Sequence, residues 1–284
     1  MSYETLITPE ELLPQIDGQD WVIVDCRFWL DDTEKGRRDY KESHIPGATY
    51  AHLDEDLSGP VVPGVTGRHP LPSVDELAAK LASWGISNGM QIVVYDDRSG
   101  AIASRLWWLL KWLGHDAVAV LDGGWPRWIS EEHPTTEDIP APKKVKFEPK
   151  VRHEMVVSAG EILTHFGDTA FKLIDSRAPE RYRGEEEIID PVAGHIPGAI
   201  NYHFERNLDI EGNFALTEFL KGRFHVILEG TPVENTTFYC GSGVTAAHNI
   251  LAFAHAGLGM PRLYAGSWSH WITDPERPIT TGKS

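Results

Sequence analysis

Short apolar, β-prone runs alternate along the chain with longer segments in which apolar positions recur at helical spacing. The clearest examples are the runs 92–95, 118–121, 236–239 and 262–264 and the helical patterns 101–113 and 246–256. Glycine ends both helical patterns, at Gly114 and Gly257. Alternation of strand and helix is typical of a mainly parallel sheet with helices on both faces. The pattern therefore predicts an α/β fold.

The pattern occurs twice, because five motifs of the first half return in the same order in the second. The pairs are Thr8–Glu11 with Ser158–Glu161, Asp25–Arg27 with Asp175–Arg177, His44–Ala48 with His195–Ala199, Asp96 with Cys240, and Gly123–Trp125 with Gly266–Trp268. The members of each pair lie 143 to 151 residues apart, which indicates an internal duplication. The first pair also predicts a capping box at two helix starts. We predict an N-terminal domain over 1–130, a proline-rich linker over 131–152 and a C-terminal domain over 153–284.

Composition limits the class of function. The formal net charge of −16 argues against nucleic acid or an anionic membrane as a partner. Only Cys26 and Cys240 are present, so we expect no disulfide framework and a cytoplasmic location. There is no CxxC or HExxH motif, and we expect neither a metal nor another cofactor. No apolar run has the length that spans a membrane, and the first residues do not form a secretory signal.

Cys240 is the strongest candidate for chemistry. It follows a predicted strand and opens the loop Cys-Gly-Ser-Gly-Val-Thr, which leads into a helix. Backbone N–H groups and the positive helix end meet at such a loop, and both favour a thiolate. Gly241 and Gly243 let the backbone curl around the sulfur. The alternative is that Cys240 is simply a small buried apolar residue.

The equivalent position in the first half is Asp96. A carboxylate cannot supply the reactive thiolate, so we expect the first half only to support the site. Cys26 ends a strand with no glycine loop after it, and we expect it to be inert.

The duplicated motifs resemble those of tandem rhodanese domains over essentially the whole chain. The loop CGSGVT is similar to that of the 3-mercaptopyruvate sulfurtransferase branch of this family. The resemblance implies two rhodanese-like domains, of which only the second is catalytic. It also implies an enzyme whose cysteine takes a sulfur atom from a small donor and holds it as a persulfide. A thiol such as thioredoxin or glutathione, or cyanide, would accept that sulfur.

The resemblance assigns roles within the loop. Cys240 is the nucleophile, and the amides from Gly241 through Gly243 and Val244 to Thr245 would hold the persulfide anion. Ser242 and Thr245 offer hydroxyl groups to the sulfur or to the departing group. For Thr245, capping of the following helix is an equally good interpretation.

The loop also bears on the donor. The thiosulfate branch of the family carries cations directly after its cysteine, whereas Gly241 and Ser242 are neutral, which favours mercaptopyruvate. Arg181 occupies the family's position for binding a carboxylate, although it could instead be an exposed charge. The family's second arginine is replaced by the acidic segment 184–190, so either Arg183 or Arg68 substitutes for it or the affinity for mercaptopyruvate is weak.

His44 and His195 precede the two Ile-Pro-Gly-Ala motifs and are more easily explained as structural, because both halves have one. We nevertheless include His44 among the substrate-binding candidates, since the face of the inactive domain can line the site.

A cysteine phosphatase is one alternative, but it needs an arginine six residues after its cysteine, and Ala246 at that position argues against it. Two other functions remain open. A thiosulfate sulfurtransferase and a persulfide relay for a protein partner are both compatible with the sequence.

Overall fold

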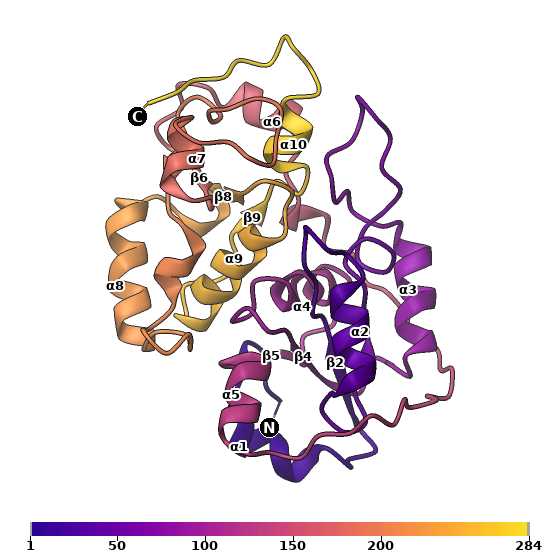
Figure 1. Ribbon diagram of the computed structural model, residues 1–284. Helices are drawn as coiled ribbons and strands as arrows, with labels where there is room; N and C mark the ends of the chain where they lie inside the picture. The colour runs from indigo at the N-terminus through magenta and orange to yellow at the C-terminus, as the bar shows by residue number, and fades with distance from the viewer. Residues whose placement is uncertain (1, 283–284) are drawn as a thin grey trace. The chain divides into compact units, whose positions relative to one another are not determined.

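The computed structural model describes residues 2–282, which form two compact units that are not contiguous in sequence (Figure 1). The first unit comprises residues 2–59, 72–152 and 210–214, and the second comprises 60–71, 153–209 and 215–282. Each half of the chain therefore contributes a short loop to the other unit. The predicted α/β class is confirmed in both.

The first unit is built on a five-stranded sheet with the order β1-β5-β4-β2-β3, and all of its neighbouring strands are parallel. Its strands are β1 (Leu6–Ile7), β2 (Trp21–Asp25), β3 (Thr49–Tyr50), β4 (Gln91–Tyr95) and β5 (Val118–Leu121). Its helices are α1 (Pro9–Leu12), α2 (Lys35–Glu42), α3 (Val74–Ser83), α4 (Ala103–Trp112) and α5 (Gly124–Ser130).

The second unit repeats this plan with four parallel strands in the order β7-β6-β8-β9. They are β6 (Lys172–Asp175), β7 (Ile200–Asn201), β8 (Thr236–Tyr239) and β9 (Arg262–Leu263). Its helices are α6 (Ala159–Thr164), α7 (Pro179–Arg183), α8 (Thr217–Leu228), α9 (Thr245–His255) and α10 (Ser267–Trp271). Short 3₁₀ helices complete the chain: η1 (Leu13–Gln15), η2 (His153–Met155), η3 (Phe204–Asn207) and η4 (Val233–Asn235).

The two faces of the second sheet bury different side chains, because successive residues of a strand point to opposite faces. Leu173 and Tyr239 belong to a core shared with α6, α7 and α10. Phe238 points the other way and meets Phe253 of α9, with ring centroids 6.2 Å apart. Phe253 in turn packs on Phe224 of α8 at 4.9 Å. Helices α8 and α9 thus lie side by side on that face (Figure 1).

A buried ion pair recurs at the carboxyl ends of β2 in the first unit and β6 in the second. Asp175 receives hydrogen bonds from Nε and Nη2 of Arg177, the shortest at 2.6 Å. The same Nη2 donates to the carbonyl of Gly194, directly before the His-Ile-Pro-Gly-Ala motif, at 2.7 Å. The guanidinium also lies 4.8 Å from the ring of Trp268. Asp25, Arg27 and Trp125 repeat this arrangement in the first unit.

The two His-Ile-Pro-Gly-Ala motifs hold extended segments in place. His195 forms a bridge with Thr280, and its Nδ1 lies 2.7 Å from the carbonyl of Tyr182. His44 pairs in the same way with Thr136, and its ring stacks on Tyr40 at 4.1 Å. Both histidines are fully buried. The geometry agrees with the structural interpretation of the motif.

Only the first predicted capping box is complete. Thr8 and Glu11 exchange side-chain and backbone hydrogen bonds in both directions. Ser158 accepts a hydrogen bond from the amide of Glu161, but the carboxylate of Glu161 pairs with Arg262 at 2.5 Å instead of returning to the backbone. The second box was therefore predicted incorrectly. Tertiary pairing with a strand residue takes the carboxylate away from the cap.

No helix within residues 2–282 is long and apolar enough to cross a bilayer.

The buried ion pair generates a prediction about stability. Asp175→Asn leaves the guanidinium of Arg177 buried without its main counter-charge, and we expect it to lower the free energy of unfolding by about 3–5 kcal/mol. Asp168→Asn is the control, because Asp168 lies on the surface of the same unit. Urea unfolding followed by circular dichroism measures both. A loss below about 1 kcal/mol in Asp175→Asn would contradict a structural role for the pair.

Candidate active site

Cys240 lies directly after β8, at the carboxyl edge of the sheet where α/β proteins bind ligands. The amide of Gly243 donates to its Sγ at 3.1 Å, and the side chain is only 2% exposed in relative terms. The backbone of Cys240 is fixed on both sides. Its amide donates to Oγ of Ser267 at 3.0 Å, and its carbonyl accepts from the amide of Trp268 at 3.0 Å. The first turn of α10 therefore positions the cysteine.

The loop around the sulfur requires glycine at position 243. Gly243 has a φ of +79°, and a Cβ there would lie 2.4 Å from the carbonyl oxygen of Ala265. Val244 is the N-cap of α9, and Thr245 is the first residue inside the helix. No side chain caps this end of α9, so the alternative interpretation of Thr245 as a cap is wrong.

Ser242 has a partner that the sequence did not reveal. Its Oγ lies 2.7 Å from Nδ1 of His69, and both residues are buried. His69 belongs to the loop 60–71, which the first half of the chain contributes to the second unit. The neighbouring amide of Arg68 donates to Oγ of Ser269 at 3.1 Å and helps to fix the loop.

Two guanidinium groups lie beside Gly241. A Cβ at this position would be 2.8 Å from Nη2 of Arg68 and 3.7 Å from both Nη1 and Nη2 of Arg181. A side chain at position 241 would therefore collide with Arg68. The loop itself is neutral, as predicted, but the surrounding residues supply two cations.

The acidic segment 185–190 holds these cations in place. Asp190 accepts a hydrogen bond from Nη2 of Arg181 at 2.9 Å and a short one from Nη1 of Arg68. Glu187 accepts from Nε of Arg181 at 3.0 Å and lies 3.5 Å from Arg177. Burial alone would raise the pKa of Glu187, but the hydrogen bonds from Arg181 and from two backbone amides outweigh it and lower the pKa.

Arg183 lies apart from this cluster and pairs with Glu180 and Glu185. Of the two candidates for a second cation, the structure brings only Arg68 to the Cys240 loop.

Comparison with known proteins agrees with this architecture. The family model described as a rhodanese-like domain matches residues 8–131 and 158–274. The chain belongs to the rhodanese family. The duplication and the predicted tandem fold are both confirmed.

The names of individual relatives refer to two different sulfur donors, 3-mercaptopyruvate and thiosulfate. A Pseudomonas aeruginosa protein named "Probable 3-mercaptopyruvate sulfurtransferase" is 48% identical over 99% of this chain and 100% of its own. A "Thiosulfate sulfurtransferase" of Cricetulus griseus is 33% identical over 92% of this chain and 89% of its own. A 3-mercaptopyruvate sulfurtransferase structure from Leishmania major has a TM-score of 0.83 and 29% identity, with 94% of this chain and 73% of that chain covered. The prediction of a sulfurtransferase is confirmed.

In the first rhodanese unit, Asp96 fills the place that Cys240 has in the second. Its carboxylate accepts four backbone hydrogen bonds at 2.7–2.8 Å, and the donors are the amides of Arg98, Gly100, Ile102 and Ala103. The loop of a rhodanese domain is thus an anion-binding cradle, and here the chain provides the anion itself.

Two other residues of the first unit, His44 and Cys26, have roles predicted from the sequence, and their surroundings bear on those roles. Nε2 of His44 is 3.1 Å from the carbonyl of Asp138, and its Nδ1 faces the carbonyl of Tyr40 at 2.6 Å. This geometry does not favour the predicted role of His44 in binding the donor. Burial, followed by the charges of Asp25 and Asp96, raises the pKa of the Cys26 thiol well above its usual value, which fits an inert cysteine.

One group of side chains in the described part of the chain could contact a metal, but its geometry argues against binding. Ligand atoms of Glu34, His52 and Glu55 lie within 4.8 Å of one another. Nε2 of His52 lies 3.0 Å from the carbonyl of Thr33, and Arg37 pairs with both glutamates. The guanidinium already provides the positive charge there.

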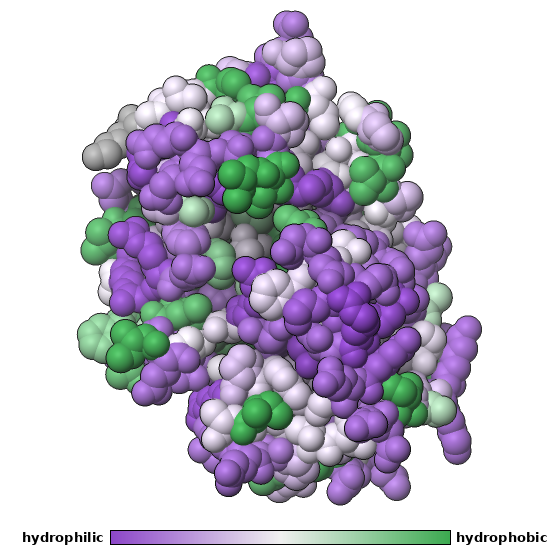
Figure 2. Space-filling view, viewed as in Figure 1, coloured by the Kyte–Doolittle hydropathy of each residue, from purple (hydrophilic) through white to green (hydrophobic). Residues whose placement is uncertain are grey.

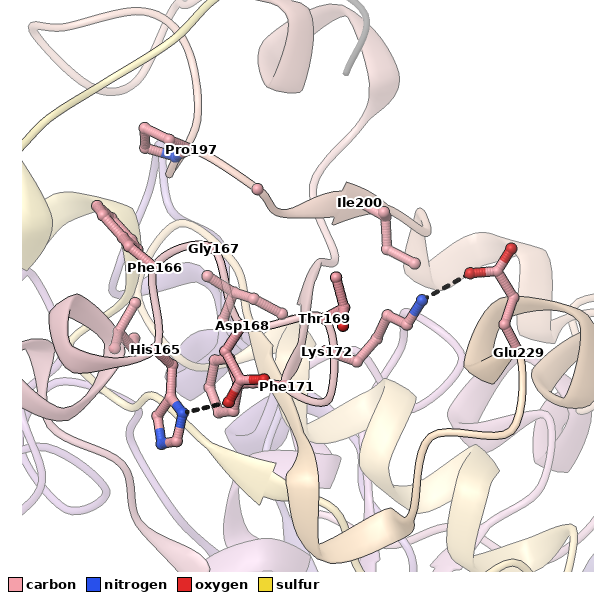
Figure 3. A pocket seen from close by; sticks show the side chains of 13 residues that line it. His165, Phe166, Gly167, Asp168, Thr169, Phe171, Lys172, Pro197, Ile200 and Glu229 are labelled. Carbon is pink, nitrogen blue, oxygen red and sulfur yellow. Dashed lines mark hydrogen bonds and ion pairs between the residues drawn. The ribbon is translucent and has the colours of Figure 1, made fainter.

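A cavity of about 360 Å³ lies elsewhere in the second unit, where β6 begins (Figure 3). Its polar side chains already have partners: Lys172 pairs with Glu229 at 2.8 Å, and Nδ1 of His165 lies 3.1 Å from the carboxylate of Asp168. Since β6 begins there and Cys240 follows the far end of the neighbouring parallel strand, this cavity is not the site of chemistry.

The cradle in the first unit can be tested directly. Asp96→Ala leaves four converging amides without their acceptor, and we expect a loss of about 3 kcal/mol in the free energy of unfolding. Sulfate should raise the melting temperature of this variant more than that of the wild type, because the anion can occupy the emptied loop. Asp97→Ala is the control, since Asp97 receives none of the four hydrogen bonds. Equal sulfate effects in all three proteins would contradict the interpretation.

Proposed function

We propose that this enzyme transfers sulfur from 3-mercaptopyruvate, through a persulfide on Cys240, to a thiol acceptor. The observation that carries the proposal is the position of the Cys240 sulfur. It accepts a hydrogen bond from the amide of Gly243, and the same loop carries Ser242, which pairs with His69, and Gly241, beside which two guanidinium groups lie.

The donor carboxylate binds between Arg181 and Arg68. A guanidinium presents paired N–H groups that match a carboxylate. Both guanidiniums are held by Asp190, so they are in place before the donor arrives. The likeness to the Pseudomonas aeruginosa protein supports this choice of donor.

The Cys240 thiolate attacks the sulfur of the donor. A new S–S bond forms, the C–S bond of the donor breaks, and its electron pair leaves with the carbon skeleton as the enolate of pyruvate. Ser242 donates a hydrogen bond to the developing enolate oxygen, and His69 orients the Ser242 hydroxyl. The proton of the donor's thiol group, which the new persulfide first carries, passes to the enolate carbon, and this gives pyruvate and the persulfide anion.

The second half-reaction restores the cysteine. Amides from Gly243 to Thr245 stabilise the persulfide anion, as the equivalent amides of the first unit stabilise Asp96. The thiolate of an acceptor such as thioredoxin or glutathione attacks the outer sulfur, and Cys240 leaves as a thiolate. Cyanide can take the same sulfur. Both cysteines are free, which fits a reducing compartment such as the cytoplasm.

The Cys240 assignment predicts a clear difference between the two cysteines. Cys240→Ser should abolish sulfur transfer and retain the fold, whereas Cys26→Ser should transfer sulfur at a rate close to that of the wild type. Mass spectrometry after treatment with donor should find one additional sulfur atom on the wild type and on Cys26→Ser only. Persulfide on Cys240→Ser would refute the assignment.

The donor is tested by measuring rates with mercaptopyruvate and thiosulfate side by side. We expect a higher kcat/KM for mercaptopyruvate, and Arg181→Ala should raise its KM about tenfold or more because a charge-assisted hydrogen bond is lost. The KM for thiosulfate should change less. Arg183→Ala is the matched control, since this arginine pairs with other glutamates. A preference for thiosulfate, with both donors affected equally, would favour the thiosulfate alternative.

A further inference from the structure

A second pocket of the same unit, of about 480 Å³, lies between η3 and α8. Unlike the cavity in Figure 3, it is lined by arginines that have no acidic partner in the described part of the chain. Tyr202, Arg206, Leu208, Arg223, Val226 and Ile227 line it. Within residues 2–282, neither Arg206 nor Arg223 forms a salt bridge with an acidic side chain.

The two arginines are held together in spite of their like charges. Nη1 of Arg223 donates a short hydrogen bond to the carbonyl of Arg206. The guanidinium of Arg206 lies 5.5 Å from the ring centroid of Tyr202. These contacts concentrate positive charge at one point of a protein whose net charge is −16.

Tyr202 is the second, independent observation. Its side chain is 2% exposed, and its hydroxyl forms no hydrogen bond of normal geometry with any residue that the structure describes. The ring packs against Phe224 of α8 at 5.3 Å, which fixes its direction. Burial raises the pKa of Tyr202, while the charges of Arg223 and Arg206 and a side-chain interaction with Arg223 oppose this increase, so both cations lie near the hydroxyl oxygen. A buried O–H group without an acceptor, beside two cations that no described acidic side chain neutralises, is an arrangement suited to an anionic oxygen.

The remaining walls are apolar. Leu208, Val226 and Ile227 come from two different elements, and Val226 is 76% exposed. Apolar surface is visible over α8 in Figure 2, in the view that Figure 1 labels. The volume lies within the range of small-molecule sites, about 300–1,000 Å³.

We propose that this pocket binds a small organic anion with an apolar body, such as an aryl phosphate or aryl carboxylate. Arg206 and Arg223 bind the anionic group, the hydroxyl of Tyr202 donates to one of its oxygens, and the aliphatic side chains contact the apolar part. The site is separate from the Cys240 loop and does not depend on the donor assigned above.

The test is isothermal titration calorimetry on the full chain with phenyl phosphate as the probe. We expect saturable binding of one probe per chain, with weaker binding of inorganic phosphate, which lacks the ring, and of phenol, which lacks the charge. Arg223→Gln should weaken binding of phenyl phosphate about tenfold or more, and Tyr202→Phe about fivefold. Lys221→Gln, which removes the same charge from α8 outside the pocket, should leave the affinity unchanged.

The Cys240 site also contains cations, so Arg181→Gln is needed to distinguish the two sites. Retained binding in Arg181→Gln together with loss in Arg223→Gln supports the α8 pocket. Loss in Arg181→Gln with unchanged affinity in Arg223→Gln assigns the probe to the catalytic site and overturns the proposal. Absence of saturable binding, or equal affinities for phenyl phosphate and inorganic phosphate, overturns it as well. Unchanged circular dichroism and sulfur transfer in Arg223→Gln exclude misfolding as the cause of a loss.

Discussion

The buried pair of Asp175 and Arg177 is the constraint on which the catalytic unit depends. It joins the end of β6 to the loop before His195, and it lies against Trp268 of α10. The turn that begins α10 in turn holds the backbone of Cys240 from both sides. A charge in the interior is costly unless its partners are fixed, so this cluster allows little variation in geometry. The position of the sulfur is therefore a consequence of the scaffold.

The duplication shows which features of the fold are structural, because these occur in both units, and which belong to the proposed chemistry, because these occur in one. Both units contain the same ion pair, the same histidine motif and the same strand–loop–helix, yet only one has a sulfur in its cradle. In the other, the Asp96 carboxylate receives the amides that would otherwise face an exogenous anion. An internal anion stabilises the loop permanently but prevents turnover. In the mechanism that we propose, the cysteine at the same place can instead take up and release sulfur.

The sequence was sufficient to predict the α/β class, the duplication and the position of Cys240, because these follow from periodicity and from motifs that recur at fixed spacing. The partner of Ser242 could not be predicted in this way. His69 lies in a proline- and glycine-containing loop without periodicity, and that loop packs with residues 173 positions away. The same limit applies to Glu187 and Asp190. Their sequence indicates only an acidic surface segment, whereas the structure buries both carboxylates against arginines. The capping box at Ser158 was wrong for the opposite reason, because a local motif was overridden by a distant residue. The carboxylate of Glu161 pairs with Arg262 and does not bond the backbone of Ser158.

These buried acids bear on the choice of donor. Arg68 and Arg181 would attract any anion if they were free, but Asp190 already compensates part of their charge. Two unit charges 4 Å apart interact by about 4 kcal/mol at an effective dielectric constant of 20, and each negative charge on the donor repels Asp190 on this scale. A monocarboxylate meets that repulsion once and gains two guanidiniums. Thiosulfate, as a dianion, doubles both its attraction to the guanidiniums and its repulsion from the carboxylates. Because Glu187 and Asp190 balance the two guanidiniums, no net positive charge offsets the cost of removing the second negative charge from water. Compensation by Asp190 therefore converts a pair of arginines from a general anion site into one that favours a single negative charge.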